Sequence, residues 1–255
     1  MKKPTISLFL MIGFFTRLPV PKVEFSEERF RKSMALMPLV GLIIGAILAL
    51  IQFCLVWLET SPLIVGGVLT GAYIFLTGGL HLEGLGDTCD GVFSGRSREQ
   101  SLEIMKDSRI GVFGTLGIFM TGLMYFALFT EIPFFGLLVF PVIGRACCLI
   151  SATMSPYARK EGMGKAASSQ GGVGSIVSAV ISIGGASLLA NLIFGMPITT
   201  SIIAASIAVL VTVLITLEFK KKLGGVTGDT FGAAIEVASL VYMFAFILIG
   251  KGLPL

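Results

Sequence analysis

The chain has 255 residues, of which 55% are hydrophobic and only 13% are charged. Several apolar runs approach the roughly 20 residues that cross about 30 Å of hydrocarbon, which excludes an ordinary soluble domain and makes the lipid bilayer the chain's surroundings. The net charge of +4 is not gathered into a basic stripe interleaved with aromatic residues, so the composition argues against nucleic acid as a partner.

The N-terminal segment, residues 1–33, is basic and precedes the first span. Its Lys and Arg residues are Lys2, Lys3, Arg17, Lys22, Arg29, Arg31 and Lys32. The apolar run 6–15 is too short to cross a bilayer, and no small-residue cleavage site of a signal peptide follows it. We expect this run to lie in the membrane interface.

Seven membrane spans are predicted in the rest of the chain. They are the apolar stretches 34–58, 62–80, 110–130, 132–153, 173–193, 197–217 and 231–250. No internal repeat and no change in composition marks a soluble domain. The sequence therefore predicts one all-α, polytopic helical membrane bundle of about seven transmembrane helices that covers residues 1–255.

Basic and neutral connections alternate between these spans. Lys and Arg occur before the first span, in the segment 81–109, and in the later loops at 159–165 and 220–222, whereas the other connections have none. Cytoplasmic loops are enriched in Lys and Arg. We therefore expect a multi-pass protein of the cell (inner) membrane whose N-terminus and three long loops face the cytoplasm.

The strongest chemical signal directly follows the second span. Glu83, Asp87 and Asp90 are spaced by four and three residues, which places them on one face of a helix, here called the acid face. Carboxylates at a membrane border repel one another and lose hydration, so a cation is expected among them. Their hard oxygen atoms favour Mg²⁺. A solvated turn whose acids face water is the alternative.

The acid face is interrupted by glycines. A glycine lets another group approach the backbone closely, so we expect these positions to admit a bulky anionic ligand. The glycines concerned are Gly84, Gly86 and Gly91.

A second polar cluster lies just before the third span. Arg109 can hold phosphate oxygens in bidentate fashion, and Lys106 can supply a compact positive charge. Asp107 can bind a metal ion or accept a proton from an attacking hydroxyl. The alternative is an ordinary cytoplasmic flank, where Lys and Arg are common.

Two ionisable residues lie inside predicted spans, where an unpaired charge is costly. Arg145 is about eight residues from the cytoplasmic end of its span, and Glu236 lies at a similar or lesser depth. We expect them to reach a common cavity, and Asp229 shares a helix face with Glu236. A purely structural ion pair between Arg145 and Glu236 is the alternative.

Three further residues are candidates for ligand contact. His81 can donate to phosphate or exchange a proton near neutral pH, and Tyr157 and Arg159 can position a ligand in the third cytoplasmic loop. Each also has a structural interpretation, because such residues are common at membrane borders. The glycine-rich stretch 154–174 is expected to avoid helix and to act as a closing lid or a flexible connector.

Clustered acids, together with cations that can bind phosphate on the same side of the membrane, favour metal-assisted attack on a phosphoester or pyrophosphate.

Sequence blocks over essentially the whole chain also resemble the cobalamin synthase family, adenosylcobinamide-GDP ribazoletransferase. The blocks are FTRLPVP (15–21), MPLVG (37–41), GGLHLEGLGDTCDG (78–91), IMKDSRIG (104–111), GR (144–145), PYAR (156–159) and GVTGD (225–229). The family often has Asp at the position of Glu83, and alanine at those of Gly86 and Cys89.

The resemblance implies that a hydroxyl of α-ribazole, or of its 5′-phosphate, attacks the cobinamide-linked phosphorus of adenosylcobinamide-GDP. GMP departs with the assistance of Mg²⁺, which leaves adenosylcobalamin or its 5′-phosphate. In this interpretation the acid face holds the metal against the pyrophosphate. Asp107 binds metal or serves as the base, and Lys106 and Arg109 stabilise the phosphate charge.

Two other functions remain open. The order Asp87-x-x-Asp90-Gly91 resembles the opening of the CDP-alcohol phosphotransferase motif, although the later paired aspartates of that motif are absent. Ionisable residues within spans also mark ion pathways, so a cation-coupled transporter is the alternative from another class. The sequence leaves open whether the protein forms a homo-oligomer.

Overall fold

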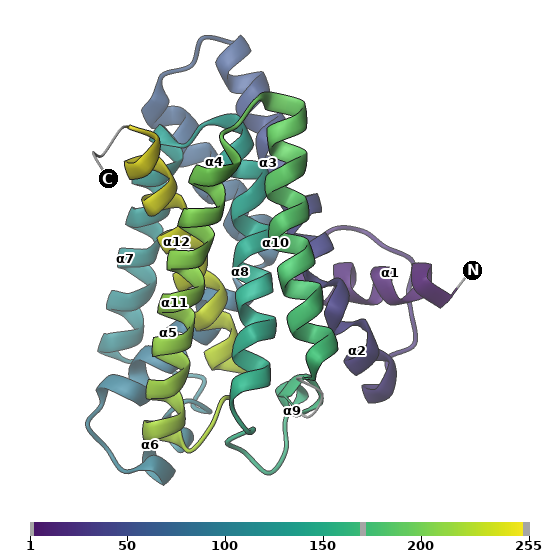
Figure 1. The fold of residues 1–255 in the computed structure, drawn as a ribbon. Helices are drawn as coiled ribbons and strands as arrows, with labels where there is room; N and C mark the ends of the chain where they lie inside the picture. Colours follow the sequence, from purple (N-terminus) through teal and green to yellow (C-terminus); the bar gives the residue numbers. More distant parts are fainter. Residues whose placement is uncertain (1–2, 169–171, 252–255) are drawn as a thin grey trace.

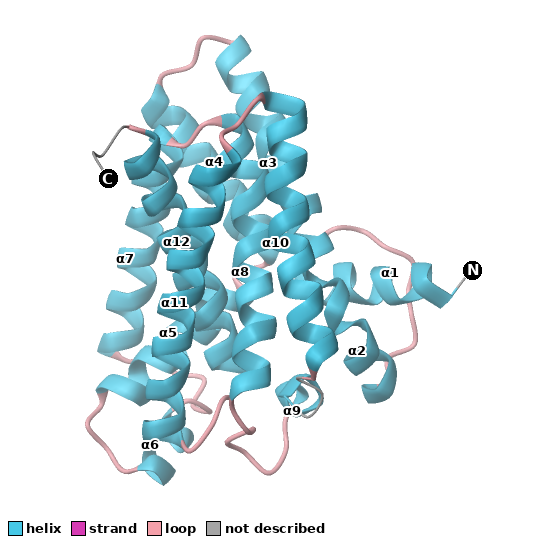
Figure 2. Cartoon of the chain, in the orientation of Figure 1, coloured by secondary structure: helices cyan, strands magenta, loops and turns pink. Residues whose placement is uncertain are grey.

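A computed structural model describes residues 3–168 and 172–251. Every regular element in this part of the chain is a helix, as Figure 2 shows, and the only pairing of extended backbone is a single bridge between Tyr157 and Val226. The all-α prediction is therefore confirmed.

Six helical stretches in the described residues are long and apolar enough to cross a membrane, and a bent pair of helices makes a seventh. The six are Glu27–Trp57, which ends in α3 (Met37–Trp57), α7 (Val112–Glu131), α8 (Phe134–Met154), α10 (Val173–Phe194), α11 (Ile198–Leu223) and α12 (Gly228–Gly250). Figure 1 shows them side by side in one bundle. The chain is a multi-pass membrane protein by length and composition, as predicted.

The bent pair corrects the predicted second span, 62–80. Helix α4 (Pro62–Thr77) ends early, and α5 (Leu80–Phe93) continues at an angle of 88° to it. Gly78 and Gly79 form the break, with φ of 63° and 71°. This left-handed backbone conformation is open to glycine and strained for other residues, so two consecutive glycines can turn the chain sharply here.

Helix α8 forms the centre of the bundle and packs against α3, α10, α11 and α12. Small residues allow this close packing, as in other membrane helices. At Gly45 of α3, an added Cβ would lie only 2.6 Å from the Leu138 carbonyl oxygen of α8. The backbones of α3 and α8 therefore touch where a larger residue would separate them.

The N-terminal arm, residues 3–36, contains α1 (Lys3–Phe15), α2 (Glu27–Ser33) and the 3₁₀ helix η1 (Met34–Leu36). Figure 1 shows α1 and α2 beside the bundle instead of within it. Met11 and Phe15 are buried, and the Arg17 N–H donates to the Leu76 carbonyl oxygen at 2.8 Å. The end of α1 is therefore attached to the bundle next to the α4–α5 break.

Two short helices, α6 (Arg98–Ile104) and α9 (Met163–Ser168), lie in the connections. Helix α9 corrects the expectation of a helix-free stretch at 154–174, of which residues 169–171 lie outside the described chain. Its Gly164 lies so close to the Gly228 backbone that an added Cβ would be 2.9 Å from that nitrogen. Tertiary packing here outweighs the low helix propensity of glycine.

Candidate active site

Helix α5 carries the acid face, as the spacing predicts. Glu83 is exposed, Asp87 is half-buried and Asp90 is buried. The Asp90 carboxylate accepts hydrogen bonds from the Gly111 N–H at 2.7 Å and the Gly114 N–H at 2.8 Å, at the start of α7. These N–H groups have no partner within their own helix, so Asp90 stabilises the N-terminus of α7. A role of Asp90 in metal binding stays a prediction.

The expected function of the glycines on α5 is wrong, because neighbouring helices fill the space beside them. An added Cβ at Gly84 would lie 2.9 Å from the Asp229 carbonyl oxygen of α12, and one at Gly86 would lie 2.9 Å from the Ile118 side chain of α7. The space beside Gly91 is filled by the Met105 side chain. The absent side chains therefore let α12, α7 and Met105 approach α5, and Gly84 also lines the cavity between α5, α12 and the N-terminal arm.

A cavity of about 230 Å³, here called the inner chamber, lies between α5, α12 and the N-terminal arm. One wall is acidic and consists of Glu83, Asp87 and Asp229. The other lining residues are Phe14, Phe15, Phe30, Met34, Met37, Leu80, His81, Gly84, Cys148, Gly164, Gly228, Phe231, Gly232 and Ile235. The chamber therefore combines three carboxylates with a largely apolar and aromatic wall.

A second cavity, here called the outer hollow, shares two of these acids and has a volume of about 530 Å³. Glu83 and Asp87 line it together with Lys106 and Asp107. The structure thus brings the acid face and the second polar cluster together, although more than ten residues separate them in sequence. Glu83 and Asp87 border both cavities.

Asp107 and Arg109 bind each other at the edge of the outer hollow. The Arg109 guanidinium donates to the Asp107 carboxylate at 2.7 to 3.2 Å, and the Arg109 side chain is 86% exposed. The hydrogen bonds from Arg109 lower the pKa of Asp107 to about 2. Asp107 is consequently charged and weakly basic near neutral pH, which suits orientation of Arg109 better than proton transfer.

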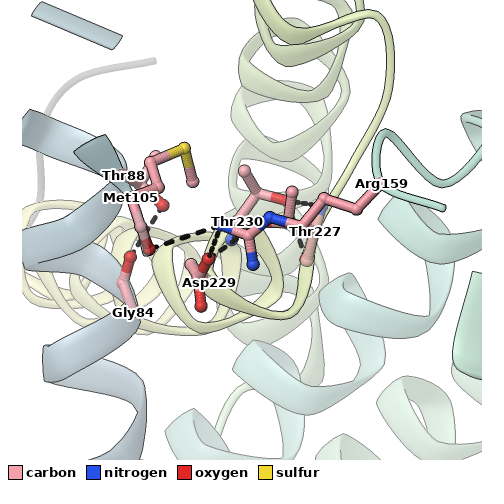
Figure 3. A network of polar contacts seen from close by, with 7 residues as sticks. All are labelled: Gly84, Thr88, Met105, Arg159, Thr227, Asp229 and Thr230. Atoms are coloured by element: carbon pink, nitrogen blue, oxygen red, sulfur yellow. Dashed lines mark hydrogen bonds and ion pairs between the residues drawn. The ribbon is translucent and has the colours of Figure 1, made fainter. Parts of the chain in front are cut away.

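Asp229 is held in the acidic wall by the network shown in Figure 3. Its carboxylate lies 2.8 Å from Arg159 Nη2 and accepts a hydrogen bond from the Thr227 hydroxyl at 3.3 Å. Arg159 also donates to the Met105 carbonyl oxygen at 3.3 Å. Arg159 therefore joins the connection between α8 and α9 to the start of α12 and the end of α6, and it lines neither cavity.

Tyr157 lies two residues before Arg159, where the chain pairs with Val226. The Ala158 N–H donates to the Val226 carbonyl oxygen at 2.8 Å, and the Val226 N–H donates to the Pro156 carbonyl oxygen at 2.9 Å. Partial burial raises the pKa of the Tyr157 phenol. The structure places Tyr157 beside the acidic wall without bringing it into the lining of either cavity.

Arg145 and Glu236 are both fully buried, but they form no direct ion pair among the described contacts. Arg145 Nη1 donates to the Pro141 carbonyl oxygen at 3.1 Å, and its Nε and Nη2 atoms have no hydrogen-bond partner. Glu236 accepts hydrogen bonds from the Tyr125 hydroxyl at 2.5 Å and the Tyr73 hydroxyl at 3.3 Å. The alternative interpretation, a direct ion pair between Arg145 and Glu236, is therefore not observed, and two tyrosine hydroxyls donate to Glu236 instead.

The expected common cavity of Arg145 and Glu236 is also not found in the inner chamber or the outer hollow. Their helix neighbours Cys148 and Ile235 line the inner chamber, so the two charged residues lie behind its wall. The tyrosines were not singled out from the sequence. The available signal was a hydroxyl inside an apolar span, which usually finds a polar partner when it is buried.

His81 is only 3% exposed and lines the inner chamber. Its ring centroid is 5.7 Å from that of Phe15, and its Nε2 atom has no hydrogen-bond partner. Buried polar atoms in proteins are usually paired, so this nitrogen is an exception that a bound molecule can satisfy.

No group of three or more His, Cys, Asp and Glu side chains in the described residues has the arrangement of a metal site. Mg²⁺ is usually held by one or two carboxylates together with substrate phosphates and water, so it does not require three protein ligands. Glu83 and Asp87 offer such hard oxygen atoms beside the outer hollow. The donor set therefore fits Mg²⁺, and metal binding stays a prediction.

Comparison with known proteins gives the chain its family. Residues 7–247 match the family described as cobalamin-5-phosphate synthase. A relative from Acetivibrio thermocellus is 42% identical over 248 residues, which cover 94% of this chain and 97% of the relative. Relatives from Fusobacterium nucleatum and Escherichia coli are 37% and 34% identical, with 94% and 93% of this chain and 96% and 97% of the relatives covered.

Each of these relatives is named adenosylcobinamide-GDP ribazoletransferase. No solved structure matches the chain. The family match covers nearly all of the described residues and includes every residue of the two cavities. The resemblance inferred from the sequence is thus confirmed, and the chain belongs to the cobalamin-5-phosphate synthase family.

Proposed function

We propose that the protein joins adenosylcobinamide-GDP to α-ribazole, or to α-ribazole 5′-phosphate, with release of GMP and with the help of Mg²⁺. Family membership makes the chain a transferase of cobalamin biosynthesis. The observation that carries the finer proposal is the position of Glu83 and Asp87, which border both cavities. A shared pair of carboxylates between two binding spaces is suited to a reaction between two substrates.

In the proposed reaction, a hydroxyl oxygen of α-ribazole forms a bond to the cobinamide-linked phosphorus. The bond from that phosphorus to the bridging oxygen of the diphosphate breaks, and the bridging oxygen leaves with GMP. The hydroxyl proton passes to solvent or to a basic oxygen at the site. When bound, Mg²⁺ neutralises charge on the diphosphate. Glu83 and Asp87 supply the carboxylate oxygens that would hold it.

The cations beside the outer hollow complete the phosphate site. Lys106 lines the hollow and adds a positive charge near the acids. Arg109 donates to Asp107, and its exposed guanidinium can turn from that carboxylate to a phosphate. Stabilisation of charge that develops on the transferred phosphorus and the leaving oxygen is the main source of catalysis in reactions of this type.

The site is proposed to open to the cytoplasm. Lys106 and Arg109 belong to the basic segment 81–109, and basic connections face the cytoplasm in membrane proteins. Asp90 ties the same end of α5 to the start of α7. The acids, the cations and the outer hollow therefore share one end of the bundle, in a protein of the cell membrane.

The test is release of GMP by the protein in detergent. The protein is incubated with adenosylcobinamide-GDP and α-ribazole, with Mg²⁺ or with a chelator, and GMP is measured by chromatography. We expect GMP only with Mg²⁺ and at least a 100-fold lower rate for Asp87→Asn. The matched control is Glu99→Gln, because Glu99 is an exposed acid on α6 that lines neither cavity.

Absence of GMP from the wild-type protein with Mg²⁺ would refute the proposal, as would an undiminished rate for Asp87→Asn. Two added arms cover the other functions that the sequence leaves open. Release of CMP from a CDP-alcohol would indicate the lipid phosphotransferase. Cation-dependent uptake into proteoliposomes without GMP would indicate the transporter.

A further inference from the structure

The inner chamber has an aromatic wall, which comes mainly from the N-terminal arm. The ring centroid of Phe14 is 4.8 Å from that of Phe15 and 4.8 Å from that of Phe30, with the rings edge to face. Phe15 and Phe30 are buried, and Met34 lines the chamber beside them. Such a surface favours a flat apolar ring, since aromatic groups stack well against other rings and against methionine.

The size of the inner chamber excludes the larger substrate. It encloses about 230 Å³, which is below the roughly 300–1,000 Å³ of sites for drug-sized ligands. A corrinoid is far larger than such a ligand and cannot enter. A bicyclic base is smaller than a drug-sized ligand and is of the right order.

Charge also separates the two cavities. Each cavity is lined by three acids, which are Glu83, Asp87 and Asp229 in the inner chamber and Glu83, Asp87 and Asp107 in the outer hollow. None of the described residues that line the inner chamber is Lys or Arg, whereas Lys106 lines the outer hollow, which offers about 530 Å³. The outer hollow therefore suits the anionic nucleotide better, and the inner chamber suits a neutral molecule.

His81 supplies the polar contact that an apolar chamber needs for recognition. Its Nε2 atom is buried without a partner in a wall that also contains Phe15. The base of α-ribazole is a benzimidazole, a flat and largely apolar bicycle with one ring nitrogen that is free to accept a hydrogen bond. An N–H of His81 can donate to that nitrogen, and the ribose hydroxyls can donate to Asp87 and Asp229 of the acidic wall.

We propose that the inner chamber binds α-ribazole, with its base against the aromatic wall, where His81 can donate to its ring nitrogen, and with its ribose along the acidic wall. This inference rests on the proposed function and adds the cavity in which each substrate binds. Because Glu83 and Asp87 border both cavities, the ribose hydroxyl meets the diphosphate of the outer hollow at these two residues.

The test compares two variants, each of which is expected to weaken the binding of a different substrate. His81→Phe keeps a ring but removes the nitrogens, and we expect it to raise KM for α-ribazole at least 10-fold with KM for adenosylcobinamide-GDP within twofold of wild type. Lys106→Gln should raise KM for adenosylcobinamide-GDP and leave KM for α-ribazole nearly unchanged, because Lys106 lines the outer hollow and not the inner chamber. Calorimetric titration of the protein with α-ribazole alone, without Mg²⁺, should show the same loss of affinity for His81→Phe.

Equal changes in both KM values, or an unchanged KM and affinity for α-ribazole in His81→Phe, would overturn the inference. If His81→Phe does not fold, Phe30→Leu takes its place, since it removes aromatic surface from the chamber and leaves Lys106 untouched. Wild-type protein that binds α-ribazole but releases no GMP would refute the proposed function alone. Protein that releases GMP while both chamber variants keep wild-type constants for α-ribazole would refute the inference alone.

Discussion

The contact between α5 and α12 can be tested with one methyl group, by the substitution Gly84→Ala. The new Cβ would lie 2.9 Å from the Asp229 carbonyl oxygen and 3.0 Å from the Asp229 Cα, whereas ordinary contacts begin at 3.4 Å. The difference, 3.4 − 2.9 Å, requires a displacement of about 0.5 Å. Both neighbours are backbone atoms, so no side-chain rotation relieves the contact and the two helices must separate.

The expected magnitude follows from this displacement. A misplacement of about 1 Å at an active site can cost on the order of 100-fold in rate, so half that distance predicts a loss of roughly tenfold. Overpacking costs about 1–3 kcal/mol, and the better helix propensity of alanine offsets about 1 kcal/mol of it. Gly84→Ala should therefore release GMP about tenfold more slowly and melt a few degrees lower.

The assay measures the initial rate of GMP release and the thermal midpoint Tm in the same detergent. Gly122→Ala is the matched control, because Gly122 also lies within a helix and nothing lies within 4 Å of its added Cβ. This variant should keep the wild-type rate, and its Tm should be equal to or slightly above that of wild type, because it gains helix propensity without a close contact. If Gly84→Ala behaves like Gly122→Ala in both measurements, the close contact between α5 and α12 is not what positions the acidic wall.

Three further predictions address single side chains. Asp87→Asn should lose Mg²⁺-dependent GMP release while its Tm stays unchanged. Asp90→Asn should lower Tm by a few degrees, because the loss of one hydrogen-bond acceptor at the start of α7 costs about 1 kcal/mol. A lower Tm for Asp87→Asn together with an unchanged Tm for Asp90→Asn would contradict the structure. Tyr125→Phe removes a donor to buried Glu236 and should cost about 1–3 kcal/mol, and an unchanged Tm would show that this hydrogen bond does not stabilise the bundle. The pKa of Asp107 is lowered to about 2, so its stabilising contact is complete above its ordinary pKa and is lost as the pH falls through about 2. When the rate of GMP release is measured between about pH 5 and 9, Asp107→Asn should show the same fall in rate toward low pH as the wild-type protein. A shift of this fall to another pH would assign Asp107 a role in proton transfer.

The sequence predicts the class of fold well, because the apolar runs alone specify most of the spans. The break at Gly78 and Gly79 was missed, since hydropathy counts these glycines as apolar residues and is insensitive to the backbone dihedral angles that they adopt. Periodicity placed Glu83, Asp87 and Asp90 on one helix face correctly.

Other features of the site depend on which helices become neighbours, and spacing along one helix does not contain that information. Asp90 accepts hydrogen bonds from the start of α7, and Gly84 faces α12, and neither contact can be read from the spacing of residues along α5. The partners of Glu236 were unpredictable for the same reason, because Tyr73 and Tyr125 come from spans that are far away in sequence.

The walls of the inner chamber come from both ends of the chain, from Phe14 near the start and Ile235 near the end. During synthesis, the lining residues of the N-terminal arm emerge from the ribosome long before those of α12 are translated. The chamber can therefore close only after nearly all the spans have been inserted into the bilayer. A nascent chain released before α12 is inserted would lack this compartment, so only a chain translated through α12 can form the inner chamber.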